Sequence, residues 1–290
     1  MKTVLIVGIN GFLGSHLAKG LQNNYRVIGL AKSKNNLYRL NDCNFMIYSS
    51  RDELGMIFKE NKIHAVINAA TVYEKISFSR DELLYANIIL PIKIYELSAQ
   101  FNVIQYLNTD TFINNKNNNY MYLQDYKLSK KHVLEWLQTI ESRCQLVNMK
   151  LFHIYGPNDS PKKFIPQIIT KFKNSEPFVN VTFGEQTRDF IFISDVVSAY
   201  KLVLEKTLLK EKFVEYEIGT GKDTSIKEVL LKVREITDSK TVINFGALEY
   251  RQNEIMKSKA NIKDLCDLGW EPKIKIEEGL KSTIETFEYE

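Results

Sequence analysis

The chain has 290 residues, 44% of them hydrophobic, and carries 39 lysines and arginines against 35 aspartates and glutamates. A chain of this length can bury a sizeable apolar core, so a globular enzyme of one large or two unequal domains is expected. The small, dispersed positive excess argues against nucleic-acid binding, and the apolar runs are too short to cross a membrane. The N-terminus enters a strand after one lysine instead of a signal-peptide apolar region, which predicts a cytoplasmic location. The three cysteines are far apart and lack histidines at metal-ligand spacing, so we expect no metal site.

The first half of the chain alternates short β-branched runs with longer amphipathic stretches. This alternation is typical of βαβ units that build a parallel sheet. The expected strands are 3–7, 26–30, 44–48, 65–68, 103–107 and 145–151, and the expected helices include 14–22, 83–101 and 126–141. Six strands in this order predict an α/β fold with a doubly wound parallel Rossmann sheet and helices on both of its faces.

Beyond Gly156 and Pro157 the pattern changes to loops and shorter elements, which predicts a second domain. A helix expected over 195–208 and a strand over 214–218 indicate that the chain returns briefly to the first domain. We therefore expect a first domain over 1–155 with a returning segment near 190–220, and a smaller α/β domain over 156–290. The asparagine-rich tract 114–119 is interpreted as a solvated loop.

Three glycines, Gly8, Gly11 and Gly14, follow the first expected strand at three-residue spacing. The first permits a tight turn, the second lets the backbone approach a pyrophosphate, and the third allows close packing of helix and strand. The helix N-terminus then offers free N–H groups to the phosphates. The pattern predicts a dinucleotide site, and an ordinary strand-to-helix turn is the alternative. The contacts expected from this turn are Gly8, Asn10, Gly11, Phe12, Leu13 and Gly14.

The end of the second expected strand lacks the acidic residue with which NAD-specific proteins bind the ribose 2′-hydroxyl. Lys32 and Ser33 stand there instead and supply a cation and a donor that suit a 2′-phosphate. The sequence therefore favours NADPH as the cofactor. The alternative is that Lys32 is a surface lysine and that NADH is also accepted, and Arg39 is either a further phosphate contact or solvated.

Tyr126 and Lys130 are four residues apart in an expected helix and so share one face of it. A free tyrosine titrates near 10, so phenolate chemistry near pH 7 requires roughly 4 kcal/mol of stabilisation. An ammonium about 4 Å away, at an effective dielectric of ~20, supplies an interaction of about that size. The pair predicts proton transfer, although an exposed amphipathic helix would show the same spacing.

Thr109 follows the expected strand 103–107, at the carboxyl end where α/β sheets place their ligand sites. Its hydroxyl can donate to a substrate carbonyl oxygen while Tyr126 delivers the proton. An ordinary strand-terminating turn is the alternative. Together with the expected nicotinamide cofactor, these residues predict an oxidoreductase that moves a hydride and a proton.

The motifs together resemble the extended short-chain dehydrogenase/reductase family, which contains the NAD-dependent epimerases and dehydratases, over nearly the whole chain. The resemblance implies a Rossmann fold, an NAD(P)-binding first domain, a mainly substrate-binding second domain and a nucleotide-linked sugar as substrate. It is carried by Gly8-x-x-Gly11-x-x-Gly14, Asn68-Ala69-Ala70, Thr109, Tyr126-x-x-x-Lys130, Phe152-His153-Ile154-Tyr155-Gly156-Pro157, Thr187-Arg188-Asp189-Phe190 with Asp195, and Leu268-Gly269-Trp270-Glu271-Pro272.

The resemblance also implies roles for single residues. Thr109, Tyr126 and Lys130 would form the catalytic triad, with Lys130 also holding the nicotinamide ribose. Asn87 would support the active site, and the helices 83–101 and 126–141 would form a homodimeric four-helix bundle, unless their apolar faces pack within the chain. The further implied contacts are Ala69, Ala70 and His153 to the cofactor, and Thr71, Thr109, Asp110, Thr111, His153, Arg188 and Arg251 to the substrate.

Departures from the family pattern narrow the expected reaction. Thr111 replaces the glutamate that serves as the base of the sugar 4,6-dehydratases, and Lys32 suits a cofactor that exchanges at each turnover. Both favour a reductase. The segments 108–112 and 245–256 are similar to the CDP-paratose and CDP-abequose synthase group, which implies NADPH-dependent reduction of a nucleotide-linked, CDP-type 4-keto-deoxyhexose for surface polysaccharide such as O-antigen. A 4-epimerase with tightly bound NAD is the alternative within enzymes, and a non-catalytic NADP-sensing protein is the alternative outside them.

Overall fold

A computed structural model describes residues 1–73, 79–114, 122–206 and 211–286 of the chain. The described residues form two compact units. The first, called here the N-terminal unit, contains the chain up to Leu151 and the returning segment Val197–Glu217. The second, the C-terminal unit, contains Phe152–Val196 and the chain from Ile218 onward. Within the described ranges, no helix is both long and apolar enough to cross a lipid bilayer.

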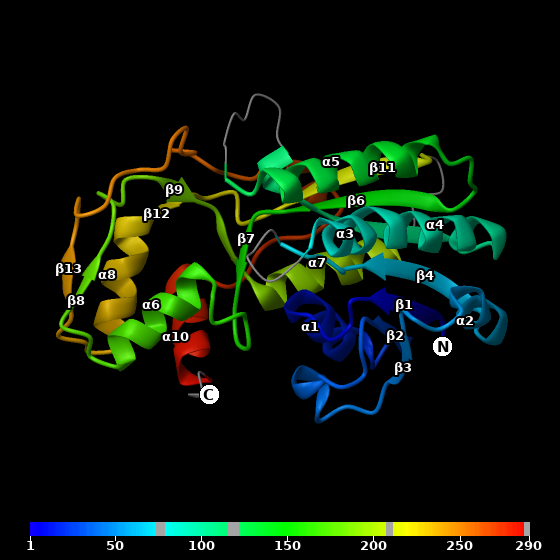
Figure 1. The fold of residues 1–290 in the computed structure, drawn as a ribbon, viewed down its shortest axis with the longest axis horizontal. Helices are drawn as coiled ribbons and strands as arrows, with labels where there is room; N and C mark the ends of the chain where they lie inside the picture. The colour runs from blue at the N-terminus through cyan, green and yellow to red at the C-terminus, as the bar shows by residue number, and fades with distance from the viewer. Residues whose placement is uncertain (74–78, 115–121, 207–210, 287–290) are drawn as a thin grey trace. The chain divides into compact units, whose positions relative to one another are not determined.

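Seven strands of the described residues form one sheet in the order β11-β6-β5-β4-β1-β2-β3 (Figure 1). Adjacent strands from β3 to β6 pair in parallel. The chain leaves β3 at one edge and returns as β4 on the other side of β1, which creates a topological switch point between β1 and β4. The predicted doubly wound Rossmann fold is therefore confirmed. The strands are β1 Thr3–Val7, β2 Arg26–Ala31, β3 Met46–Ser49, β4 Ile63–Asn68, β5 Gln105–Thr111, β6 Gln145–Leu151 and β11 Phe213–Ile218.

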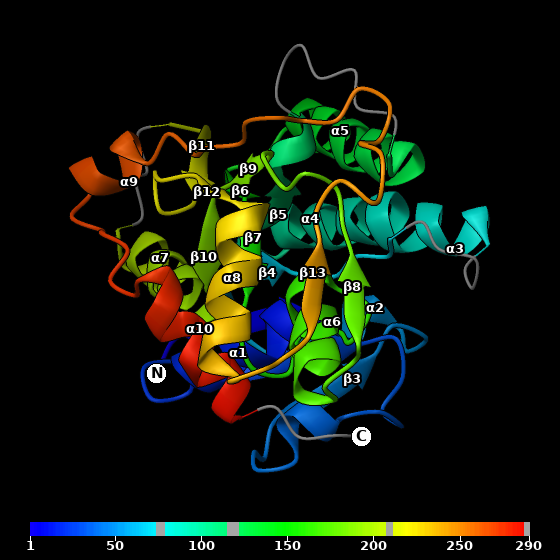
Figure 2. The same cartoon turned by 90° about the vertical axis from the view of Figure 1, so that its left-hand side faces the viewer.

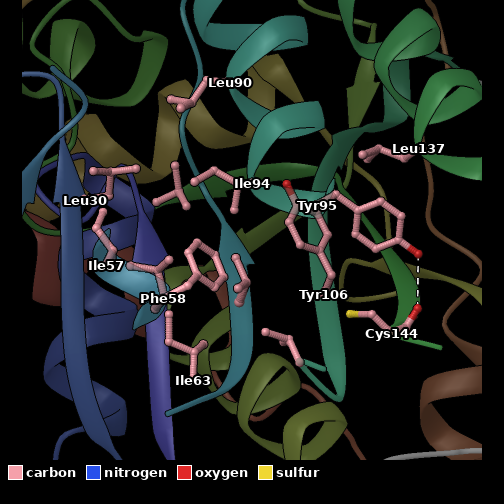
Figure 3. Close-up of a cluster of buried hydrophobic side chains, with 14 of the residues drawn as sticks. Leu30, Ile57, Phe58, Ile63, Leu90, Ile94, Tyr95, Tyr106, Leu137 and Cys144 are labelled. Atoms are coloured by element: carbon pink, nitrogen blue, oxygen red, sulfur yellow. Dashed lines mark hydrogen bonds between the residues drawn. The ribbon is translucent and has the colours of Figure 1, made fainter. Parts of the chain in front are cut away.

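Helices cover the sheet because its central strands are apolar on both faces, and all residues of β1 and β6 are buried. Figure 3 shows the core on one face, where α2, α4 and α5 pack on β1, β2, β4 and β5. The helices of this unit are α1 Phe12–Leu21, α2 Leu54–Glu60, α3 Arg80–Leu84, α4 Leu90–Gln100, α5 Gln124–Thr139 and most of α7 Ile193–Glu205. Short turns of helix occur at η1 Tyr38–Leu40, η2 Tyr85–Ile89 and η3 Phe112–Asn114.

Some element boundaries differ from the predicted ones. β5 begins at Gln105 and runs on to Thr111, because it keeps its register with β6 as far as Leu151. The predicted helix 83–101 begins earlier, at a capping box that Ser79 forms with Glu82, and contains the π-helical turn η2. Residues 115–119 of the expected loop and 207–208 of the helix expected over 195–208 lie outside the described residues.

The C-terminal unit consists of short strand pairs and helices (Figure 2). Buried carboxylates hold its loops together: Asp189 accepts from the backbone N–H groups of Thr220, Gly221 and Ala260, and Asp195 from those of two residues before α10. The strands are β7 His153–Tyr155 with β10 Phe190–Phe192, β9 Thr187–Arg188 with β12 Thr224–Ser225, and β8 Phe178–Asn180 with β13 Val242–Asn244. The helices are α6 Phe164–Lys173, α8 Ile226–Ile236, α9 Lys263–Asp267 and α10 Ile276–Glu285.

Candidate active site

The turn between β1 and α1 needs glycine at two of its positions for different reasons. Gly8 has a φ of +82°, and a Cβ there would lie 2.7 Å from the backbone of Ala70. A Cβ on Gly14 would lie 2.1 Å from the carbonyl oxygen of Gly8. The turn is therefore compact and bare, and it brings the backbone after β4, at Ala69 and Ala70, against the glycine turn.

The N-terminus of α1 is open to an anion. Gly11 is its N-cap residue, and in the part of the chain that the structure describes no side chain caps this end and no acidic residue occupies the first turn. The N–H groups of the first helical turn thus carry a positive partial charge without an internal counter-charge. This geometry fits the pyrophosphate of a dinucleotide. Asn10 stabilises the entry to the turn by donating from Nδ2 to the carbonyl of Asn36 at 3.1 Å.

Lys32 already has a carboxylate partner in the structure. Its Nζ lies 2.7 Å from Oε1 of Glu82, the first-turn residue of α3, and both side chains are solvent-exposed. Ser33 is exposed and its Oγ accepts from the N–H of Asn35. Arg39 stacks on Tyr38 and donates to the carbonyl of Asn10, so it lies beside the glycine turn. A 2′-phosphate at this place would therefore compete with Glu82 for Lys32.

The sequence predicted that Thr109 follows a strand, but the residue lies within β5. It is fixed at two points. The Nζ of Lys130 donates to its carbonyl oxygen at 2.9 Å, and its Oγ1 lies 2.8 Å from Oη of Tyr200 in α7. The structure thus brings Thr109 and Lys130 into direct contact. Tyr200 was not identified from the sequence, because it lies 91 positions from Thr109 in a helix without a recognisable motif.

Tyr126 is buried in the first turns of α5, and its ring lies 4.7 Å from that of Tyr73 between centroids. Burial raises the pKa of this phenol well above its usual value, Tyr73 and Asp110 raise it further, and a hydrogen bond with Thr111 lowers it. The sequence predicted a lowered tyrosine pKa, but the net shift in this structure is upward, because burial is the largest effect and the neighbouring Tyr73 and Asp110 add to it. Tyr126 is held as a neutral phenol, which is a proton donor.

Lys130 is buried on the same helix, one turn after Tyr126. Burial lowers its pKa to about 8, against the opposing effect of the Asp110 carboxylate. An amine with this pKa is mostly protonated at neutral pH and loses its proton in mildly alkaline solution. Lys130 thus supplies a buried positive charge whose presence depends on pH.

Asn87 braces the loop after β4 against α5. From the π-helical turn η2 its side chain accepts from the N–H of Val72 at 2.7 Å and donates to the carbonyl of the same residue at 2.8 Å. It also donates to Oγ of Ser129, which lies between Tyr126 and Lys130 in the sequence. Because Tyr73 follows Val72 directly, Asn87 positions two segments that contact Tyr126. Such π-helical turns often occur at functional sites.

Asp110 is a buried residue near the end of β5, with 3% of its surface exposed. Its Oδ1 accepts from the N–H of Thr111 and from Asn114, and its Oδ2 accepts from Asn148. Both oxygens are therefore occupied within the N-terminal unit. The family resemblance implied that Asp110 contacts the substrate, but in the structure its oxygens accept hydrogen bonds from neighbouring residues. Thr71, which the resemblance also implied as a substrate contact, is exposed.

Asp110 is attached to a row of three buried amides that crosses the sheet. Asn68 donates to Asn108, Asn108 donates to Asn148, and Asn148 donates to the carboxylates of Asp110 and Glu215. The row ends at an ion pair in which Nζ of Lys150 lies 2.6 Å from Oε1 of Glu215. Lys150 follows Asn148 on β6, on the same face of the strand. At its other end, Oδ1 of Asn68 is buried without a hydrogen-bond partner among the described residues.

Three residues implied as ligand contacts lie in the C-terminal unit. Arg188 is buried and forms an ion pair with Glu254 and hydrogen bonds with the carbonyls of Thr187 and Ile255. Its guanidinium therefore fixes the segment before residue 256, whereas Arg251 in the same segment is exposed. His153 in β7 is half-buried by surface area, and burial together with Arg188 and Lys163 lowers its pKa well below the usual value, so it is a neutral imidazole.

The chain belongs to the NAD dependent epimerase/dehydratase family, whose model matches residues 4–219. The family resemblance inferred from the motifs is confirmed. The chain is 34% identical to the CDP-abequose synthase of Salmonella typhimurium strain LT2, with 97% of each chain covered. Among solved structures it is similar to a UDP-glucose 4-epimerase of Thermotoga maritima with UDP-glucose, at a TM-score of 0.85, 25% identity and 98% coverage of each chain. MoeE5 in complex with UDP-glucose and NAD shares the fold at a TM-score of 0.82 and 22% identity, over 98% of this chain and 97% of that one.

Proposed function

We propose that this chain is an NADPH-dependent nucleotide-sugar ketoreductase that reduces the C4 keto group of a CDP-linked 4-keto-deoxyhexose. The observation that carries the proposal is the arrangement around α5, where the buried phenol of Tyr126 lies one helical turn from Lys130, whose Nζ donates to the carbonyl of Thr109. A reduction begins with a proton donor, whereas an oxidation begins with a base. Thr111 in place of a dehydratase glutamate and the likeness to a CDP-abequose synthase support the same reaction.

The residues divide the reduction between them. Bound reduced nicotinamide supplies the hydride. Thr109 Oγ1 donates a hydrogen bond to the carbonyl oxygen, which stabilises the negative charge that develops there. Tyr126 then delivers its proton to that oxygen, and the transfer is favourable because an alkoxide is a much stronger base than a phenolate. The Lys130 ammonium, on the same face of α5, stabilises the phenolate that remains.

The cofactor would be held mainly by the N-terminal unit. The uncapped N-terminus of α1, with no acidic residue in its first turn, fits the diphosphate, and the glycines at positions 8 and 14 keep side chains out of the turn before it. The N–H groups of the turn from Asn10 to Leu13 would donate to the phosphates, and Ala69 and Ala70 would line the nucleotide. Lys32 and Ser33 would bind the 2′-phosphate that distinguishes NADPH, and Lys130 would contact the nicotinamide ribose. His153 would approach the nicotinamide as a neutral imidazole.

We propose that residues of the C-terminal unit also contribute to substrate binding. Thr71, Thr111 and His153 would contact the sugar, and the exposed Arg251 would bind the diphosphate with its planar guanidinium. Arg188 would act by fixing the segment that carries Arg251, because its own guanidinium is paired with Glu254. The role of Asp110 would likewise be to hold the end of β5, since its oxygens accept hydrogen bonds from the sheet.

A homodimer is part of the proposal. The helices α3 and α5 and the turn η2 carry large apolar side chains that are exposed in the single chain: Leu84, Tyr85, Ile89, Leu128 and Trp136. Exposed apolar side chains that gather on neighbouring elements are typical of an interaction surface. Light scattering after size exclusion measures the oligomeric state. We also propose a cytoplasmic location and a product used for surface polysaccharide, which cell fractionation and a gene deletion would test.

A substrate panel tests the reaction. The protein is mixed with NADPH or NADH and with CDP-, dTDP-, UDP- and GDP-linked 4-keto-6-deoxyhexoses, and loss of reduced-nicotinamide absorbance is followed. We expect oxidation of NADPH with the CDP-linked sugar and a product reduced at C4. Failure to oxidise either cofactor with any member of the panel would contradict the ketoreductase.

A 4-epimerase is the second candidate, because the epimerase of Thermotoga maritima matches this fold along almost its full length. An epimerase returns the hydride to its substrate, so it would retain NAD through purification and interconvert nucleotide sugars without net oxidation. Mass analysis of the purified protein's cofactor, together with incubation with UDP-glucose, separates the two functions.

A further inference from the structure

The hydroxyl of Thr109 is paired with a tyrosine that belongs to none of the motifs above. Tyr200 lies in α7, and its Oη is 2.8 Å from Thr109 Oγ1. The Tyr200 side chain is completely buried, whereas Thr109 is half-buried. Both residues belong to the N-terminal unit. The pair therefore joins a fully buried residue to a partly exposed one.

The number of protons and acceptors decides the direction of this hydrogen bond. A phenol has one O–H proton, and Thr109 Oγ1 is the partner that the described residues offer it. If Thr109 donated, the Tyr200 proton would be buried without an acceptor, which is costly. If Tyr200 donates, both groups are satisfied, because a threonine hydroxyl can accept one hydrogen bond and donate another. Burial also raises the pKa of Tyr200, so it keeps the proton that it donates.

A threonine that accepts from Tyr200 must direct its own proton elsewhere. Its backbone is fixed as well, because Lys130 donates to the Thr109 carbonyl at 2.9 Å and β5 pairs with β6 at this residue. Thr109 thus has both its side-chain rotation and its backbone position constrained. A hydroxyl that accepts a hydrogen bond is also a better donor, because hydrogen bonds in a chain polarise one another.

We propose that Tyr200 is a positioning residue for carbonyl reduction, which donates to Thr109 Oγ1 and so leaves the threonine proton directed at the substrate oxygen. The inference rests on the proposed ketoreductase function. It assigns a role in the reaction to α7, a helix that the motifs connect with the site only through Asp195 at its start.

The test is a double-mutant cycle between Tyr200→Phe and Thr109→Val, measured as NADPH oxidation with the CDP-linked ketosugar. Phenylalanine fills the same space and removes only the donor. We expect Tyr200→Phe to lower kcat about tenfold with KM and the cofactor Kd within about twofold, since one transition-state hydrogen bond is weakened. Thr109→Val should lower kcat about a hundredfold. In the Thr109→Val background, Tyr200→Phe should have no further effect on kcat.

Tyr95→Phe is the matched control. It removes another buried tyrosine hydroxyl, which donates to the carbonyl of Cys144 at 3.0 Å in the core (Figure 3). Both variants should lower the thermal unfolding midpoint by similar amounts, but only Tyr200→Phe should lower kcat. Thr109→Ser, which keeps a hydroxyl, should retain part of the dependence on Tyr200.

Two kinds of result overturn the inference. If Thr109 instead donates to Tyr200, the Tyr200→Phe variant frees the threonine proton, and its kcat equals or exceeds that of the wild type. If the effects of Tyr200→Phe and Thr109→Val multiply, Tyr200 does not act through Thr109. An active wild type with either result refutes the inference alone, whereas an inactive wild type across the substrate panel refutes the proposed function and the inference together.

Discussion

Gly14→Ala tests whether the shape of the glycine turn determines cofactor binding. The added Cβ would lie 2.1 Å from the Gly8 carbonyl oxygen, 2.8 Å from its carbonyl carbon and 2.9 Å from Ile9 Cα. All three are backbone atoms, so they cannot rotate away, and an ordinary contact begins at 3.4 Å. Relief therefore requires α1 to move away from the turn by more than 1 Å.

The magnitude follows from two opposing effects. Alanine in a helix is favoured over glycine by roughly 0.5–1 kcal/mol, whereas overpacking against fixed atoms costs roughly 1–3 kcal/mol. Because the clash is with backbone, we expect the upper part of that range and a net destabilisation of about 2 kcal/mol. The displaced N–H groups of α1 should weaken NADPH binding at least tenfold, because hydrogen bonds to charged groups contribute about 1.5–3 kcal/mol each.

Gly55→Ala is the matched control for this prediction. Gly55 lies in the first turn of α2, and the nearest atom to its added Cβ is Glu53 Oε1 at 4.0 Å. This variant should gain about 0.5–1 kcal/mol of unfolding free energy and bind cofactor normally. Urea unfolding measures the stability, and titration calorimetry with NADPH measures the affinity. Wild-type cofactor affinity in Gly14→Ala would refute the argument that close backbone contact shapes the phosphate site.

The site allows three further predictions. The kcat should fall as pH rises through about 8, because Lys130 with its lowered pKa is charged below that pH and neutral above it; a pH profile flat to pH 10 would contradict a role for its charge. Glu82→Gln should increase the preference for NADPH over NADH several-fold, because it releases Lys32 from its ion pair. An equal ratio of the NADH and NADPH Kd values in the wild type and the variant would show that Lys32 does not contact the cofactor. Asn87→Ala should reduce kcat at least tenfold and lower the free energy of unfolding by about 1–3 kcal/mol, because Val72 and Ser129 lose a buried hydrogen-bond partner. Unchanged kcat would show that the hydrogen bonds of Asn87 are not needed for turnover.

The sheet could be predicted from the sequence because its strands are continuous apolar runs that only a buried parallel sheet accommodates. The extension of β5 to Thr111 could not, because the polar run from Asn108 to Thr111 has the composition of a turn. These residues are extended because their partners, such as Asn148, come from a strand about 40 positions later. Local composition contains no information on partners that distant.

The same limit applies to the site. The spacing of Tyr126 and Lys130 indicated a shared helix face, which the structure has, but it did not reveal how deeply that face is buried. The pKa of Tyr126 is raised instead of lowered, because burial, the largest effect, acts in the same direction as the neighbouring Tyr73 and Asp110. Tyr200 and Glu82 contact Thr109 and Lys32 across 91 and 50 positions, and neither belongs to a motif. Residues that act through long-range partners are found only once the chain is folded.

The amide row from Asn68 to Asn148 has a consequence for how the protein can vary. Each amide donates in the same direction, toward the carboxylates of Asp110 and Glu215, so a change at the middle position, Asn108, strands a donor on one neighbour and an acceptor on the other. A single replacement would thus cost roughly twice the 1–3 kcal/mol of one stranded group, most of the margin of many domains. The three asparagines should therefore be inherited as a set, because even their joint exchange for apolar residues would take the Asn148 donor from the buried Asp110 carboxylate.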